Sequence, residues 1–356
     1  MALEAGLFSG RPLCWKKLDI TGDRIVPRSS HSATLVGDML VVFGGYGGGV
    51  ERHDFCHIHK DTLRCTAVNP TGPTDSSERS ATARVGHSAA ALSNHIYIFG
   101  GWNGTEYVNS GILYDVKAME LVHEQIKGRV LPPARRDHAC VVVRDNMYVI
   151  GGWNTMDFFN DVWFLNPSWV WQCAEVSGTP PLPRRGHSAS AVGNYIFVFG
   201  GIYGLTKYLN DLYVFDTTTS TWSQIAMQGE VPSPRAWHTA TTVGKFIFVF
   251  GGTAGRTRFY NDIYVLDTET LQWHLISTIG SQPEERASHS ATLINNQIVI
   301  FGGITPSIVD SNINPLENAF ALLVDIALVE SAGFDPRTFR IPQADGVQRD
   351  EEPVKA

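Results

Sequence analysis

Six copies of the short motif Arg-x-x-His run through the chain and are its most conspicuous chemical groups. They occur at Arg28/His31, Arg84/His87, Arg135/His138, Arg184/His187, Arg235/His238 and Arg286/His289. Imidazoles bind zinc and act as acids or bases near neutral pH. A metal ion needs three or four ligands together, whereas each histidine here belongs to a separate copy of a repeat. We therefore expect a structural hydrogen-bonding role for the histidines, and no metal site.

The residues around the motif are also repeated. A Gly-Gly pair follows 16 residues after every arginine, at 44–45, 100–101, 151–152, 200–201, 251–252 and 302–303. Successive arginines are 56, 51, 49, 51 and 51 residues apart, and a period near fifty indicates a repeat architecture. We predict one domain over residues 12–328, a short N-terminal segment at 1–11 and a flexible C-terminal tail at 329–356.

Each repeat has the pattern of four short strands. In the fourth copy, residues 188–192 and 195–199 are rich in small, β-branched and aromatic residues and flank a Gly-Asn turn, which is a strong hairpin signal. Residues 210–216 and 221–225 supply two more strands. Sheets of this kind bury both faces by stacking around an axis. The expected fold is all-β, a six-bladed β-propeller of four-stranded antiparallel blades.

A tryptophan in the fourth strand indicates how the ring closes. Trp15, Trp171, Trp222 and Trp273 each lie seven residues before a glycine, and we expect the rings to wedge between neighbouring blades. Trp15 precedes the first motif, while the last copy has Ser331 at this position. The N-terminal strand is therefore expected to complete the last blade and so remove the exposed sheet edges.

These motifs resemble the Kelch repeat family. The resemblance consists of Arg-x-x-His-Ser/Thr, an apolar run into Gly-Gly, the Asn-Asp-Leu-Tyr of residues 210–213 and a downstream tryptophan, and it covers about residues 12–328. It implies a compact six-repeat propeller, with no BTB or F-box segment visible. Similar proteins include a Rab-GTPase effector and substrate receptors of cullin ubiquitin ligases. In Kelch-like adaptors the equivalent loops hold acidic peptides with arginines.

The loop before each Arg-x-x-His and the loop after each Gly-Gly should share one end of the propeller, because strand direction alternates. Aromatic residues and arginine dominate protein-binding hot spots. The candidate partner-binding residues at this end are Tyr46, Trp102, Arg136, Asp137, Trp153, Arg185, Tyr203, Trp237, Arg256 and Arg258. Phe158 and Phe159 fit a binding role and a core-covering role equally. The long loop 66–83 is either a recognition loop or a neutral insertion.

Composition excludes several classes of function. The net charge is −7 and no basic run exceeds two residues, so we expect no nucleic-acid binding. No stretch reaches the roughly 20 apolar residues of a membrane span, and the N-terminus lacks the pattern of a secretory signal. Five cysteines without a Cys-x-x-Cys pair favour a reducing, cytoplasmic location and no disulfide framework.

The sequence thus predicts a monomeric, non-catalytic protein-interaction module without a cofactor: a scaffold, effector or substrate receptor. Two alternatives stay open. One is a small-GTPase (Rab-type) effector in membrane traffic, and the other is a small-molecule enzyme with its site in the central channel.

Overall fold

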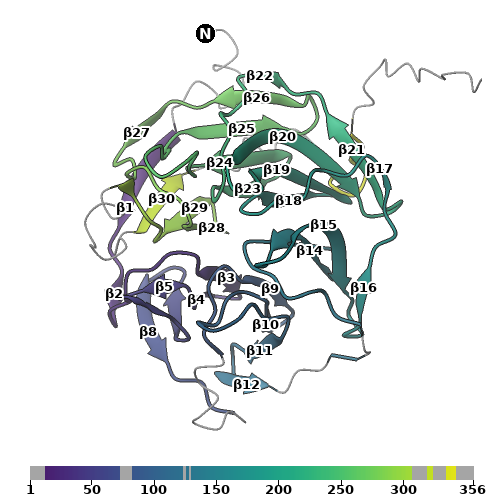
Figure 1. Ribbon diagram of the computed structural model, residues 1–356. Coiled ribbons are helices and arrows are strands. Elements are labelled where there is room, and N and C mark those ends of the chain that lie inside the picture. Colours follow the sequence, from purple (N-terminus) through teal and green to yellow (C-terminus); the bar gives the residue numbers. More distant parts are fainter. Residues whose placement is uncertain are drawn as a thin grey trace, which may run out of the picture.

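The protein forms a ring of six β-sheets around a central axis (Figure 1). The computed structural model describes residues 13–72, 82–122, 126–127, 130–306, 319–323 and 334–341. The predicted all-β, six-bladed propeller is confirmed. No helix among the residues described is long and apolar enough to cross a membrane.

Each blade contains four antiparallel strands, with the first strand innermost. Blade 1 consists of β3 (Ser32–Val36), β4 (Met39–Phe43), β7 (Phe55–His59) and β8 (Arg64–Val68). Blade 2 consists of β9 (Ser88–Leu92), β10 (His95–Phe99), β11 (Gly111–Asp115) and β12 (Glu120–Val122). Blade 3 consists of β13 (Ala139–Val143), β14 (Asn146–Trp153), β15 (Phe158–Leu165) and β16 (Trp171–Cys173). Blades 4 and 5 consist of β18 (Ser188–Val192), β19 (Tyr195–Tyr203), β20 (Lys207–Asp216) and β21 (Thr221–Ile225), and of β23 (Thr239–Val243), β24 (Phe246–Phe250), β25 (Ile263–Asp267) and β26 (Gln272–Leu275).

Blade 6 combines the two ends of the propeller. It contains β28 (Ser290–Ile294), β29 (Gln297–Phe301) and β30 (Ala319–Leu323), and its fourth strand is β1 (Leu13–Leu18). β1 pairs antiparallel with β30 and places Trp15 opposite Leu322. The predicted closure by the N-terminal strand is confirmed.

Four blades carry a fifth, very short strand that the sequence analysis missed. β2 (Thr21–Gly22), β17 (Ser177–Gly178), β22 (Gln228–Gly229) and β27 (Thr278–Gly280) each pair in parallel with the fourth strand of the following blade. This pairing explains the glycine seven residues after each tryptophan. A Cβ atom on Gly178 would lie 2.1 Å from the carbonyl oxygen of Trp222, so only glycine allows the two backbones to approach this closely.

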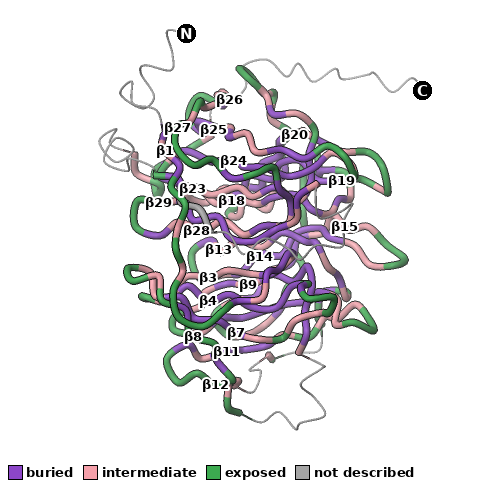
Figure 2. Tube along the Cα trace, turned by 90° about the vertical axis from the view of Figure 1, so that its left-hand side faces the viewer, coloured by how far each residue is buried: buried purple, intermediate pink, exposed green. Residues whose placement is uncertain are grey.

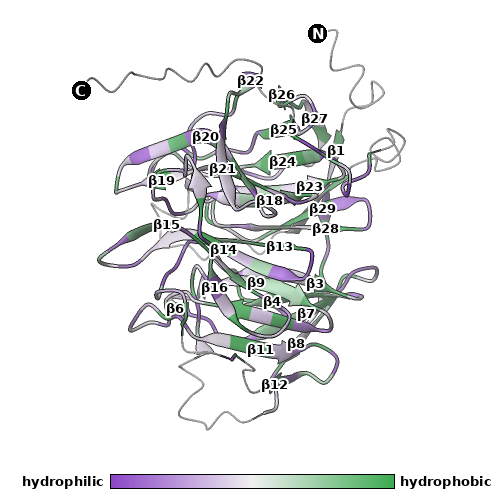
Figure 3. Cartoon of the chain, turned by 90° about the vertical axis from the view of Figure 1, so that its right-hand side faces the viewer, coloured by the Kyte–Doolittle hydropathy of each residue, from purple (hydrophilic) through white to green (hydrophobic). Residues whose placement is uncertain are grey.

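The hydrophobic core consists of six clusters, one between each pair of neighbouring blades. Figure 2 shows the buried strands at the centre and the exposed loops at the two ends, and in Figure 3 the strands alternate between polar and apolar segments. The fourth-strand tryptophans are buried as predicted. Trp15, Trp171 and Trp273 contact Phe250, Phe99 and Phe199 of the preceding blade at ring-centroid distances of 4.9–5.2 Å.

Part of the predicted tail belongs to the folded core. Residues 334–341 lie against blade 4, and Phe339 is only 6% exposed within the cluster between blades 4 and 5. The remainder of 329–356, like the N-terminal segment 1–11, lies outside the described residues.

Candidate partner-binding face

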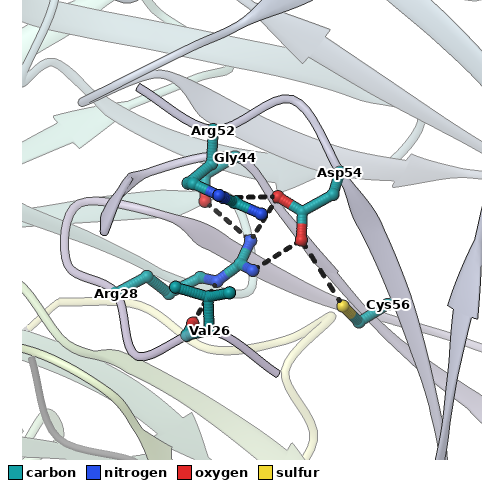
Figure 4. Close-up of polar contacts among 6 residues, drawn as sticks. All are labelled: Val26, Arg28, Gly44, Arg52, Asp54 and Cys56. Atoms are coloured by element: carbon teal, nitrogen blue, oxygen red, sulfur yellow. Dashed lines mark hydrogen bonds and ion pairs between the residues drawn. The ribbon is translucent and has the colours of Figure 1, made fainter. Parts of the chain in front are cut away.

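The arginine of each repeated motif is fully buried inside its own blade. Figure 4 shows the first copy, in which the Arg28 guanidinium donates hydrogen bonds to Asp54 at 2.6 and 3.2 Å and to the carbonyl of Gly44 at 3.0 Å. Arg52 donates to the same carboxylate at 3.0 Å. The bond to the first glycine explains the constant spacing of 16 residues. Blades 3, 4 and 5 repeat this arrangement with Arg135/Asp161, Arg184/Asp211 and Arg235/Asp262.

The six histidines pack between blades. In five of them Nε2 lies 2.8–2.9 Å from a serine or threonine hydroxyl of the preceding blade, in the pairs His31/Ser290, His87/Ser32, His138/Ser88, His238/Ser188 and His289/Thr239. Burial, aided by the charge of the arginine three residues earlier, lowers the pKa of His31, His87 and His187 to about 3. The rings are therefore neutral at physiological pH, in line with the expected structural role.

One of the six inter-blade bonds is missing. His187 should pair with the residue after His138, but that residue is Ala139, which has no hydroxyl. The Nε2 atom of His187 is consequently buried without a hydrogen-bond partner among the described residues. The boundary between blades 3 and 4 thus differs from the other five in its polar contacts.

A closed ring of backbone hydrogen bonds surrounds the axis. The residue before each histidine has a positive φ of 53–67°, and its N–H donates to the corresponding residue of the preceding blade at 2.7–3.0 Å. The ring consists of Ser30, Gly86, Asp137, Gly186, Trp237 and Ser288. These residues and the six histidines line a cavity of about 170 Å³ on the axis. Within the described ranges, no three His, Cys, Asp or Glu side chains are grouped so as to hold a metal ion.

The two predicted sets of loops do meet at one end of the propeller. The residue after each motif arginine forms an antiparallel bridge with the residue after each Gly-Gly, in the pairs Ser29/Tyr46, Val85/Trp102, Arg136/Trp153, Arg185/Ile202, Ala236/Thr253 and Ala287/Ile304. At least one of the two positions holds an aromatic residue or an arginine on each of blades 1 to 4, whereas blades 5 and 6 carry small and aliphatic residues. The shared backbone therefore presents chemically different side chains around one face.

Five of the predicted residues form a compact group, here called the Arg185 cluster: Arg136, Asp137, Trp153, Arg185 and Trp237. The Arg185 guanidinium lies 4.1 Å from the ring centroid of Trp153 and 5.4 Å from that of Trp237. Asp137 is buried and accepts hydrogen bonds from Trp153 Nε1 and Arg136 Nε, both at 3.1 Å. The cluster joins the tops of blades 3, 4 and 5 beside the axial cavity, which Asp137 and Trp237 also line.

Among the described residues, Arg185 has no polar partner of its own. Its Nε atom is buried without a hydrogen bond, and the described residues provide no ion pair for its guanidinium. Burial lowers the pKa of Arg185 from its ordinary value, while the nearby carboxylate of Asp137 partly opposes that shift. A guanidinium carries five donors in a planar fork that matches a carboxylate. This one is fixed by aromatic contacts and left available to an acceptor.

Further aromatic residues extend the cluster. Phe158 stacks on Trp153, with centroids 5.7 Å apart, and Tyr107 links Trp153 to Trp102 through contacts of 5.6 and 5.1 Å. Sequence reasoning missed Tyr107 and Tyr208, which both act electrostatically on Arg185. Both follow Gly-Gly within the same type of loop, so extending the search to the far side of these loops could have found them.

The other predicted residues lie apart from the cluster. Tyr46 is exposed in the small hairpin β5 (Tyr46–Gly47) and β6 (Val50–Glu51) of blade 1, and Tyr203 is exposed at the end of β19. Arg256 and Arg258 are exposed on blade 5, and Arg258 lies over Tyr260 at 5.4 Å. Trp102 contacts Tyr107, which in turn contacts Trp153 of the cluster.

The sequence left a binding role and a core-covering role open for both Phe158 and Phe159, and the two residues differ in their surroundings. Phe158 belongs to the aromatic extension of the cluster, whereas Phe159 lies under the buried Arg135 at 4.2 Å and covers the blade. Residues 73–81 of the long loop lie outside the described part of the chain.

Two long hairpins project from the propeller next to the Arg185 cluster. β14 and β15 on blade 3, and β19 and β20 on blade 4, extend beyond the other strands at the same end of the molecule (Figures 2 and 3). Their tips carry the most exposed large apolar side chains of the described residues, Met156 at 86% and Leu205 at 75% exposure. The cluster is thereby flanked by apolar hairpin tips, an arrangement suited to contact with the surface of another protein.

Comparisons with known proteins agree with this architecture. The family described as the KLHDC2/KLHL20/DRC7 Kelch-repeats domain matches residues 6–201 and 86–303. Kelch domain-containing protein 3 of Mus musculus is 30% identical over 300 residues, which cover 79% of this chain and 78% of that protein. Host cell factor 2 of Homo sapiens is 33% identical over 249 residues, which cover 63% of this chain and 31% of that protein.

Proposed function

Because this chain belongs to the Kelch-repeat family, we propose that it is a non-catalytic interaction module that binds a protein partner on the face carrying the Arg185 cluster. The observation that supports this most strongly is the guanidinium of Arg185, which is held between Trp153 and Trp237 and has no hydrogen-bond acceptor among the residues that the structure describes. A partly buried, unpaired charged donor is unfavourable in the free protein. A partner that supplies an acceptor removes this penalty.

The partner group that fits best is a carboxylate. It can accept two parallel hydrogen bonds from the guanidinium, while the flanking indole rings exclude water from the contact. Asp137 already accepts from Arg136 and Trp153, so its charge is partly compensated and a single negative charge can approach. The exposed tips at Met156 and Leu205 add apolar contact on either side.

The central channel gives less support to an enzymatic role. Its six histidines are all shifted in one direction, toward the neutral form, by burial and neighbouring arginines. General acid–base catalysis uses groups whose environments push their pKa values apart. Five of the six Nε2 atoms are already engaged in inter-blade bonds.

The proposal is tested by affinity capture from cells with wild type and the variant Arg185→Ala/Trp237→Ala. Lys117→Ala, exposed in the turn after β11 at the opposite end of the propeller, is the matched control. A partner captured by wild type and the control should be lost from the double variant. With that partner purified, Arg185→Ala should weaken binding about 10- to 100-fold, as expected for truncating a hot-spot arginine.

Equal recovery of all partners by the double variant means that another face binds. Repeating the capture in the presence of GDP or a non-hydrolysable GTP analogue separates the Rab-type alternative, which requires a nucleotide-dependent partner.

A further inference from the structure

The end of the propeller opposite the Arg185 cluster carries a segment that belongs to no blade. Residues 334–341, drawn in yellow in Figure 1, follow blade 6 in sequence but lie against the hairpin of β18 and β19 in blade 4. The turn of this hairpin is at the start of β19, whereas Tyr203 marks the other end of the strand. The segment is therefore remote from the candidate binding face.

The segment is a self-contained turn. The carbonyl of Asp335 accepts hydrogen bonds from the N–H groups of Thr338 and Phe339, both at 3.1 Å. The Asp335 side chain also accepts from the backbone and the side chain of Arg337, both at 3.0 Å. All of these bonds are made between residues of the segment itself.

Docking occurs through aromatic contacts. Phe339 is almost fully buried and meets Tyr195 edge-on, with centroids 5.6 Å apart and an interplanar angle of 89°. Phe334 packs on Phe339 at 5.6 Å, and Ile341 lies at the border of the same cluster. The contact thus consists of two phenylalanines that bracket a turn, seated on an apolar surface of blades 4 and 5.

A glycine in blade 4 makes room for the segment. A Cβ atom on Gly193 would lie 2.3 Å from the carbonyl oxygen of Pro336. Gly37 occupies the same hairpin position in blade 1 with nearly the same φ, 59° against 60°, but a Cβ atom there would meet nothing within 4 Å. The backbone conformation is therefore common to both turns, and close approach of another segment is special to Gly193.

We propose that blade 4, at the end opposite the Arg185 cluster, has a docking site for a turn bracketed by two phenylalanines, and that the chain's own residues 334–341 fill this site. The docked segment would act as a second latch, meaning a second contact that holds the closed ring together. The first latch, β1 in blade 6, joins the chain ends at one blade. The second ties the chain that leaves blade 6 to blade 4.

The pair Gly193→Ala and Gly37→Ala tests the latch in the full-length protein. Both changes carry the same penalty for alanine at positive φ, but only Gly193→Ala collides with the segment. Limited trypsin digestion at Arg337 and Arg340, followed by mass spectrometry, measures release. We expect cleavage about thirty times faster in Gly193→Ala, as for an opening equilibrium that loses one buried aromatic ring, and the wild-type rate in Gly37→Ala.

Phe339→Ala completes the experiment. In that background the segment is already released, so adding Gly193→Ala or Gly37→Ala should give the same cleavage rate and the same stability. Equal cleavage of the two glycine variants in the wild-type background, or unchanged cleavage in Phe339→Ala, overturns the latch. Partner capture through the Arg185 face is expected to be unchanged in all of these variants, so this test is independent of the proposed function.

Discussion

Substitution of Ala139 by serine should stabilise the protein, because it supplies the one hydroxyl that the six inter-blade contacts lack. The equivalent hydroxyls lie 2.8–2.9 Å from a histidine Nε2 atom at the other five boundaries. The buried Nε2 of His187 has no hydrogen-bond partner of good geometry among the described residues, although the backbone of Ile150 interacts with the ring. A new buried hydrogen bond contributes about 1 kcal/mol, and relief of the unpaired atom brings the gain to about 1–2 kcal/mol. For a domain of roughly 300 residues this raises the melting temperature by about 2–3 °C.

The assay is chemical and thermal unfolding of Ala139→Ser beside two reference variants. Ala139→Cys adds a side chain of similar size with only a weak donor, and should give little of the gain. Ser32→Ala removes the hydroxyl opposite His87 and should cost about 1–3 kcal/mol. If Ala139→Ser is neutral or destabilising, or if the cysteine variant matches it, the reasoning about the missing bond is wrong.

Two further predictions concern acid stability and ring closure. Burial lowers the pKa of His31, His87 and His187 from 6.5 to about 3 in the folded protein and lowers the pKa of the other three motif histidines in the same direction, so below pH 6.5 the unfolded chain binds more protons. Stability should be unaffected above about pH 7.5 and fall by about 1.4 kcal/mol per histidine and pH unit below 6.5; retention of native circular dichroism at pH 4.5 contradicts this. Deletion of residues 1–22 removes β1 and exposes the edge of β30, and should give an insoluble or strongly destabilised protein. A soluble deletion variant with the melting temperature of wild type refutes closure by β1.

The residues that recur in every copy determine the features that the sequence predicts correctly. The motif arginine reaches the carbonyl of the glycine 16 residues later within one blade, so a constant spacing reflects a local contact. The fourth-strand tryptophan likewise marks the fourth strand of a blade, and its position near the N-terminus indicates that this strand completes the last blade. Trp153 and Arg136 lie directly after repeated residues, so the sequence predicts that both occupy the same end of the propeller.

The features that were missed depend on contacts between blades that no single repeat displays. The parallel pairing of Gly178 appears only when the next blade brings Trp222 against it. The docking of Phe339 on Tyr195 joins residues far apart in the chain. The role of Tyr208 depends on a neighbouring loop that places Arg185 beside it. Such contacts follow from assembly of the ring. The repeated glycine marks the parallel pairing without showing which strand it pairs with, and the contacts of Phe339 and Tyr208 leave no periodic signal in the sequence.

Hydrogen–deuterium exchange of the protein with and without its captured partner tests the central claim most directly, because it reports which end of the propeller is covered. The account predicts slower exchange at the Arg185 cluster, over residues 136–137, 153–158 and 185, and at the neighbouring tip of the β19–β20 hairpin. Exchange in the opposite-end turns at Gly37, Lys117 and Gly193 should not change. Protection confined to those turns, with the Arg185 cluster exchanging as in the free protein, would contradict the account.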